Sequence, residues 1–172
     1  TPVPRPVATT IINEPKKVSA WGVFFWKHPI RDSRCMTAIF VDEGSRSYFT
    51  EVTGEKGLGG NFPSCPWPPV RKAFQQRWML HYGRPMYIRA DPEGIFSSNE
   101  YLAYLEELGL IVDTMCGQAH WQNGVAERMI RMHKITAEGL ARSYPDMSFQ
   151  ELFDLAAWAH CHCYDRHGFT PA

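Results

Sequence analysis

The stretch GQAHWQNGVAERM, residues Gly117 to Met129, combines a tight turn, a helix start and a carboxylate. Asn123 is a good residue for capping a helix, and Gly124 after it can adopt backbone angles that other residues avoid. The pair therefore predicts that a loop closes here and a helix begins, which places Glu127 in the first helical turn. The positive end of the helix dipole stabilises a carboxylate in that turn, so Glu127 has a structural explanation as well as a functional one.

A second carboxylate, Asp91, favours the functional explanation. It follows an apolar run, Met86 to Ala90, that glycine and proline residues bound on both sides. This pattern predicts a short strand with Asp91 at its tip. The residues between Asp91 and Glu127 are expected to form a helix over 98–108, a strand over 110–114 and a loop.

Two segments of this half, DPEGIF at 91–96 and QNGVAER at 122–128, resemble the core domain of retrotransposon and retroviral integrases, which belongs to the RNase H-like superfamily. The resemblance extends from Trp21 to Pro171. It implies an α/β fold in which a three-stranded antiparallel meander and two parallel strands form a mixed five-stranded sheet flanked by helices. It also implies an active site of two aspartates and one glutamate, which holds two magnesium ions for phosphoryl transfer to DNA.

The remaining segments supply the other elements that such a fold requires. Aromatic and β-branched residues predict the strands, and apolar residues at helical spacing predict the helices. The elements expected are strands over 18–26, 35–42 and 47–52 and helices over 70–81, 125–144 and 148–164. The domain is expected to span 18–172, after an extended proline-rich arm over 1–17.

The opening strand departs from the integrase pattern at the first catalytic aspartate. In integrases this strand carries a tryptophan, two further residues and then the aspartate, whereas the segment here is WGVF, from Trp21 to Phe24. Phe24 thus occupies the expected place of the first metal ligand, and an aromatic ring cannot coordinate magnesium. Asp91 and Glu127 are predicted to be remnant catalytic acids.

Asp42 is the alternative for the missing ligand. The segment VDEGSR that contains it matches an integrase position that is not catalytic, so a substitute role for Asp42 is not expected. Asp32 lies in a turn beyond the opening strand and is a weaker alternative still.

The charge balance bears on nucleic acid binding. The formal net charge is 0, with 18 Lys and Arg residues against 18 Asp and Glu residues, which argues against tight binding of DNA by the whole surface. A local basic face is predicted on the helix that contains Glu127, where Arg128, Arg131 and Lys134 recur at three-residue spacing. The alternative is a solvated helix face on which Arg131 pairs with Glu127 or Glu138.

The last predicted helix contains HCHC at 160–163, which at first suggests a metal site. Adjacent helical residues point about 100° apart, so the four side chains do not share one side and no zinc site is expected. The five scattered cysteines favour reduced thiols in an intracellular compartment. The nucleus is expected for an integrase, with an organelle as the alternative if the N-terminus is processed. No apolar run is long enough to span a membrane.

These patterns predict an integrase-core-like domain without catalytic activity, in which Phe24 replaces the first metal-binding aspartate. Its expected role is that of a structural, protein-binding or nucleic-acid-binding module in a larger assembly, such as a domesticated retrotransposon domain. Protein partners, a second copy of the chain and nucleic acid are the candidate partners, and no cofactor is expected. The alternative is an active retrotransposon polynucleotidyl transferase with magnesium or manganese on Asp91 and Glu127.

Overall fold

The opening strands form the antiparallel meander that the sequence predicts. In the computed structural model, which describes residues 14–57, 65–90, 94–114 and 124–163, β1 (Val18–Lys27) pairs with β2 (Ser33–Asp42), and β2 pairs with β3 (Tyr48–Gly57). Strand β3 continues beyond its predicted end at residue 52, because its polar second half pairs with the start of β2. Most of the predicted proline-rich arm, residues 1–13, lies outside the described residues.

Two parallel strands complete the sheet. β4 (Tyr87–Ala90) pairs with β1, and β5 (Ile111–Thr114) pairs with β4, which gives a five-stranded sheet in the order β3-β2-β1-β4-β5. Parallel neighbours need a crossover connection, and α4 (Asn99–Glu107) supplies it after the short helix η2 (Gly94–Ser97). The predicted mixed α/β sheet is therefore confirmed.

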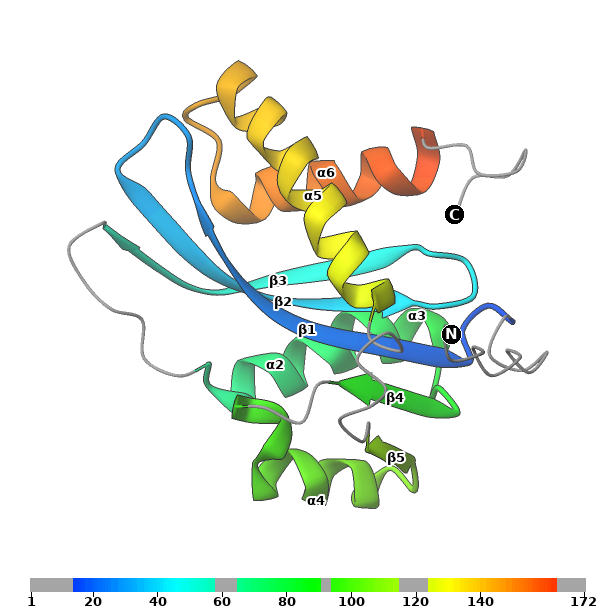
Figure 1. The fold of residues 1–172 in the computed structure, drawn as a ribbon. Helices are drawn as coiled ribbons and strands as arrows, with labels where there is room; N and C mark the ends of the chain where they lie inside the picture. Colours follow the sequence, from blue (N-terminus) through cyan, green and yellow to red (C-terminus); the bar gives the residue numbers. More distant parts are fainter. Residues whose placement is uncertain (1–13, 58–64, 91–93, 115–123, 164–172) are drawn as a thin grey trace, which may run out of the picture.

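Helices cover both faces of this sheet (Figure 1). One face packs against α5 (Gly124–Ser143) and α6 (Phe149–Cys163). The other face packs against α4 and a helix that runs without a break through α2 (Trp67–Ala73), the π-helical η1 (Phe74–Met79) and α3 (Leu80–Tyr82). No helix among the described residues has the length and apolar character needed to cross a membrane.

The helix predicted over 70–81 begins earlier than expected. Pro68 and Pro69 lie in its first turn, where the missing backbone N–H of proline has no helical partner to lose. Both prolines therefore belong to the helix.

Trp21 fixes the orientation of β1 between the two cores. Its side chain is fully buried on the α2 and α4 side, where its ring centroid lies 4.5 Å from that of Phe74 and 5.1 Å from that of Phe40. Its indole Nε1 donates a hydrogen bond to the Ser19 hydroxyl at 2.9 Å. Because successive strand residues alternate between faces, Gly22 and Phe24 point toward α5 and α6.

Side chains from α6 close the outer edge of β3. The Gln150 amide accepts a hydrogen bond from the Val52 N–H at 2.8 Å and donates one to the Thr50 carbonyl at 3.2 Å. Arg77 bridges this edge and α6, with its guanidinium 2.7 Å from Glu51 and 3.2 Å from Asp154. These contacts satisfy backbone groups that an open edge would expose and hold α6 against the sheet.

Candidate functional site

A cavity opens where β4 ends beside β1. β4 pairs with β1 only over Val18 to Trp21, so the described part of the neighbouring strand leaves the β1 edge uncovered from Gly22 onward. The cavity has a volume of about 420 Å³ and lies between β1, η2 and the first turns of α5. Its lining residues are Trp21, Gly22, Val23, Phe25, Cys65, Gly94, Ile95, Phe96, Ala126, Glu127 and Ile130.

Glu127 brings a carboxylate to this cavity. It lies in the first turn of α5, as predicted, and its side chain is exposed. Among the described lining residues it is the one acidic side chain.

Burial raises the pKa of the Cys65 thiol, which also lines this cavity, and favours its neutral form. Asp91, the other predicted remnant acid, lies outside the described residues.

Gly22 is the β1 residue that faces the same turns of α5. A Cβ atom built on Gly22 would lie 3.1 Å from Cδ1 of Ile130 on α5 and 3.4 Å from Cγ2 of Ile39 on β2. Ile130 is one helical turn from Glu127, and both line the cavity with Gly22. A side chain at position 22 would therefore project toward the start of α5.

Phe24, the predicted position of the lost aspartate, lies in the core instead of the cavity. Its side chain is only 4% exposed, and its ring centroid lies 5.7 Å from that of His133 and 6.0 Å from that of Phe153. The Lys134 ammonium lies 5.4 Å from the centre of the same ring. The structure thus places Phe24 beside a later part of α5 than the turn that carries Glu127.

Asp42 has a structural role at the turn between β2 and β3. Its buried carboxylate accepts hydrogen bonds from the Lys16 N–H at 2.9 and 3.0 Å, the Gly44 N–H at 3.2 Å and the Ser45 hydroxyl at 2.7 Å. The β1–β2 register places Asp42 opposite Ser19, away from the β1 residues that line the cavity. The carboxylate is therefore engaged by the turn and the end of the predicted arm.

We expect Asp42→Asn to lower the free energy of unfolding by about 1–3 kcal/mol, because an uncharged amide leaves some of these donors without an acceptor. Urea denaturation followed by circular dichroism measures the change. The matched control is Asp32→Asn, at an exposed position in the β1–β2 turn, which should stay within about 0.5 kcal/mol of the natural chain. Equal stability of the two variants would contradict the structural role of Asp42.

The predicted basic residues on α5 differ in their surroundings. Arg128 and Arg131 are exposed and form no ion pair with another described residue. An ion pair further along this helix joins Arg142 to Glu138 at 3.2 Å. Lys134 is half-buried against the Phe24 ring. The pairing of Arg131 with Glu127 or Glu138, which was the alternative to a basic face, is thus absent from the described residues.

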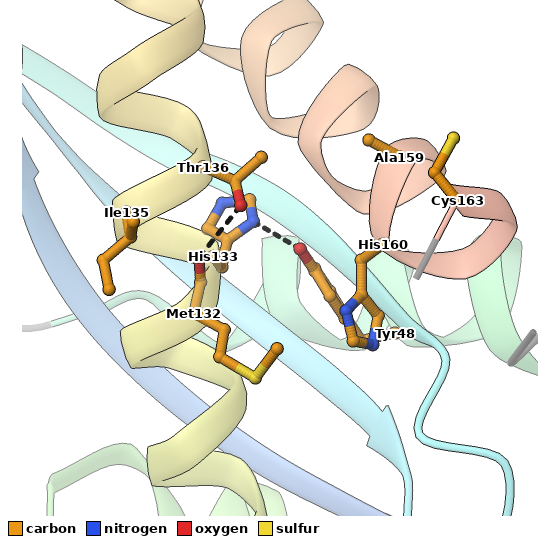
Figure 2. Close-up of a pocket in the computed structure, with 8 residues that line it drawn as sticks. All are labelled: Tyr48, Met132, His133, Ile135, Thr136, Ala159, His160 and Cys163. Atoms are coloured by element: carbon orange, nitrogen blue, oxygen red, sulfur yellow. Dashed lines mark hydrogen bonds between the residues drawn. The ribbon is translucent and has the colours of Figure 1, made fainter. Parts of the chain in front are cut away.

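A second cavity, of about 310 Å³, lies between α5, α6 and β3 (Figure 2). At its base the Tyr48 hydroxyl and His133 Nδ1 are 2.8 Å apart. Burial, followed by the charges of His160 and Lys134, lowers the pKa of His133 to about 3. Tyr48 and His133 are far apart in sequence, so no local pattern in the chain indicates this pair.

The HCHC run at 160–163 lies at the end of α6 and contributes two side chains, His160 and Cys163, to the second cavity. His160 Nε2 lies 2.9 Å from the Arg46 carbonyl. In the part of the chain that the structure describes, no group of three or more His, Cys, Asp and Glu side chains is arranged to hold a metal ion.

Comparisons with known proteins show which solved structures this fold resembles. No protein-family model and no curated protein matches the sequence. The catalytic core of HTLV-2 integrase, solved with magnesium in a dimeric form, matches with a TM-score of 0.69 and 18% identity over 91% of this chain and 94% of that chain. The BIV integrase core matches with a TM-score of 0.67 and 15% identity over 91% of each chain.

A longer protein matches in the same way. A chain of the simian T-cell lymphotropic virus intasome matches with a TM-score of 0.71 and 16% identity, over 92% of this chain and 52% of that chain. These matches bear out the resemblance seen in DPEGIF and QNGVAER at the level of architecture. The chain has the fold of a retroviral integrase catalytic core.

Proposed function

We propose that this domain is a catalytically inactive integrase-like core that binds nucleic acid as a module of a larger assembly. The observation that carries the inactivity is the set of side chains around the cavity at the end of β4. A site for two magnesium ions needs about three acids on a rigid frame. The described lining offers the carboxylate of Glu127, and Asp42 is engaged elsewhere by four hydrogen bonds. These residues do not fit a two-metal centre.

Two arginines support nucleic acid as the partner. Arg128 and Arg131 are exposed on α5, close to Glu127 at the cavity. Arg128 follows Glu127 in the sequence, and Arg131 lies one helical turn further on. Neither forms an ion pair with another described residue, and both side chains are exposed, which allows them to contact phosphates. Lys134 contributes less, because its ammonium lies over the ring of Phe24. The neutral net charge of the chain makes this local face the main source of affinity.

The test is the salt dependence of DNA binding, followed by fluorescence anisotropy with a labelled duplex. The Arg128→Ala/Arg131→Ala variant should weaken binding at every salt concentration. It should also reduce the slope of log affinity against log salt by about 2, because each lost phosphate contact removes about one released counterion. Arg142→Ala, on the same helix and paired with Glu138, is the control and should leave the slope unchanged.

The inactivity is tested on the same protein with a strand-transfer assay in magnesium and in manganese. We expect no joined product above the protein-free background. Product formation that Glu127→Gln abolishes would contradict the inactivity and favour the polynucleotidyl transferase. Absence of DNA binding at low salt would contradict the nucleic acid role and favour a protein partner.

A further inference from the structure

We infer that the segment Glu14 to Lys17, which leads into β1, is a latch that couples the N-terminal side of the domain to β4. When the segment is latched, it holds the start of β4 against β1. When the segment is released, the start of β4 loosens while β1, β2 and β3 stay paired. The inference is separate from the proposed function, because it rests on none of the residues that line the first cavity or that face nucleic acid.

The turn between β2 and β3 holds one end of this segment. The Lys16 N–H donates hydrogen bonds to both carboxylate oxygens of Asp42, at 2.9 and 3.0 Å. Asp42 is buried, so these charge-assisted bonds are stronger than they would be in water. The Lys16 ammonium also lies 5.2 Å from the centre of the Tyr82 ring on α3, which is a cation–π contact. The segment is therefore fixed to the turn by its backbone and to α3 by a side chain.

Gly44 allows the segment to lie directly on the turn. A Cβ atom built on Gly44 would overlap the Glu14 carbonyl oxygen and would lie 2.6 Å from the Pro15 nitrogen. Both are backbone atoms, so neither can move aside as the end of a flexible side chain would. The described glycines with left-handed backbone angles are Gly83, Gly94 and Gly109, so the backbone of Gly44 does not itself require glycine. The absent side chain is thus a condition for latching.

Backbone strain occurs at the same contact. Among the described residues, Lys16 and Arg46 are the non-glycine residues with left-handed backbone angles, with φ of 68° and 69°. Both are bound to Asp42, since the Lys16 N–H donates to its carboxylate and the Arg46 N–H donates to its carbonyl at 2.8 Å. Residues with side chains persist in this region only where the surrounding contacts hold them there. Lys16 should therefore leave this conformation once its bonds to Asp42 are lost.

Lys17 connects the latch to β4. Its carbonyl accepts hydrogen bonds from the Met86 N–H at 2.7 Å and from the Tyr87 N–H at 3.2 Å. Tyr87 is the first residue of β4, and this short strand pairs with β1 only over Val18 to Trp21. The two bonds therefore contribute much of what holds the start of the strand. Because Lys16 and Lys17 are adjacent, a change in the backbone of Lys16 displaces the carbonyl that β4 uses.

Other contacts limit how far the release can extend. Arg89 of β4 lies 3.2 Å from Glu43 of the β2–β3 turn, and both side chains are largely buried. The other edge of β4 pairs with β5. We therefore expect release to speed local opening at the start of β4 and not to unfold the sheet.

The test is residue-resolved amide hydrogen exchange of the full chain, followed by nuclear magnetic resonance. In Gly44→Ala the added methyl group should displace the segment, and the Met86 and Tyr87 amides should exchange at least about tenfold faster than in the natural chain. The amides that pair β2 with β3 should keep their rates. Gly139→Ala is the matched control, because a Cβ at that position meets no described atom within 4 Å, and it should leave the Met86 and Tyr87 rates unchanged.

Lys16→Pro releases the latch from the other side. Proline has no N–H to donate to Asp42, and its ring fixes φ at about −65°, far from the φ of 68° observed here. The position is exposed and lies outside the sheet, so this variant replaces Gly44→Ala if the latter does not fold by circular dichroism. It should speed exchange of the Met86 and Tyr87 amides to a similar extent.

Two results would overturn the inference. The first is unchanged exchange of the Met86 and Tyr87 amides in either variant when it is folded. The second is an equal acceleration throughout β2 and β3, which would mean a global loss of stability and no latch. Neither result depends on nucleic acid, so failure of this inference and failure of the proposed function are distinguishable.

Discussion

Phe24→Asp is expected to lower the free energy of unfolding by about 3–5 kcal/mol, because the substitution takes a carboxylate out of water and places it in a core of packed rings. The Phe24 side chain is only 4% exposed and contacts the rings of His133 and Phe153. The Lys134 ammonium, which lies over the native ring, would offset part of the cost. Urea denaturation followed by tryptophan fluorescence measures the loss, since Trp26 packs on Phe153 in the same core.

The matched control is Phe24→Leu, which keeps an apolar side chain and should cost no more than about 1.5 kcal/mol. A small difference between the aspartate and leucine variants would show that position 24 is open to solvent or to a cation. That result would support Phe24 as the place of the missing ligand. A large difference assigns Phe24 to the core.

Gly22 and Phe24, which share one face of β1, show where sequence reasoning stops. A strand repeats its faces every two residues, so Gly22 and Phe24 have the same phase and both point to α5. Counting from Trp21 by the integrase spacing selects Phe24, yet the packing of Trp21 into the opposite core fixes only which face each residue takes. The distance along α5 separates the two positions, and this distance depends on how the helix lies across the strand. Sequence periodicity does not contain it.

The fold could be predicted from the sequence more fully than the site, because it depends on local patterns. The strands and helices follow from local patterns, such as the apolar run before Asp91 and the Asn-Gly pair in the sequence before Glu127, and the resemblance supplied their order in the sheet. Two of the predicted boundaries were wrong, each for a different reason. β3 continues to Gly57 because β2 offers partners, and the helix starts at Trp67 because prolines are tolerated in a first turn.

The pair formed by Tyr48 and His133 was not predictable, because it joins β3 to the middle of α5 and neither residue belongs to a local motif. In the sequence, His133 is one histidine within an amphipathic helix. In the structure it is 1% exposed and lies beside Phe24 and Phe153, with its Nδ1 on the Tyr48 hydroxyl. Its neutral form is part of the core, and the stability of the domain should therefore depend on pH.

We expect the domain to lose stability as the pH falls below about 6.5. The folded-state pKa of His133 is about 3, below its ordinary value of 6.5, so the unfolded chain binds the proton more strongly. The stability contribution of the neutral form is complete above pH 6.5 and declines toward pH 3, by at most about 1.4 kcal/mol per pH unit and of the order of 5 kcal/mol in total. Burial lowers the pKa of His28 and His160 as well, which adds loss in the same direction.

Urea midpoints measured between pH 4 and 7.5 test this expectation, and a double variant isolates His133. His133→Phe alone would leave the Tyr48 hydroxyl buried without a partner, so Tyr48→Phe/His133→Phe removes both members of the pair. In the double variant, the slope of the unfolding free energy against pH should fall by up to about 1.4 kcal/mol per pH unit, which corresponds to one proton. The contributions of His28 and His160 to that slope should remain. An unchanged slope would mean that His133 is already accessible to protons in the folded state, and the acid sensitivity would then belong to the other histidines.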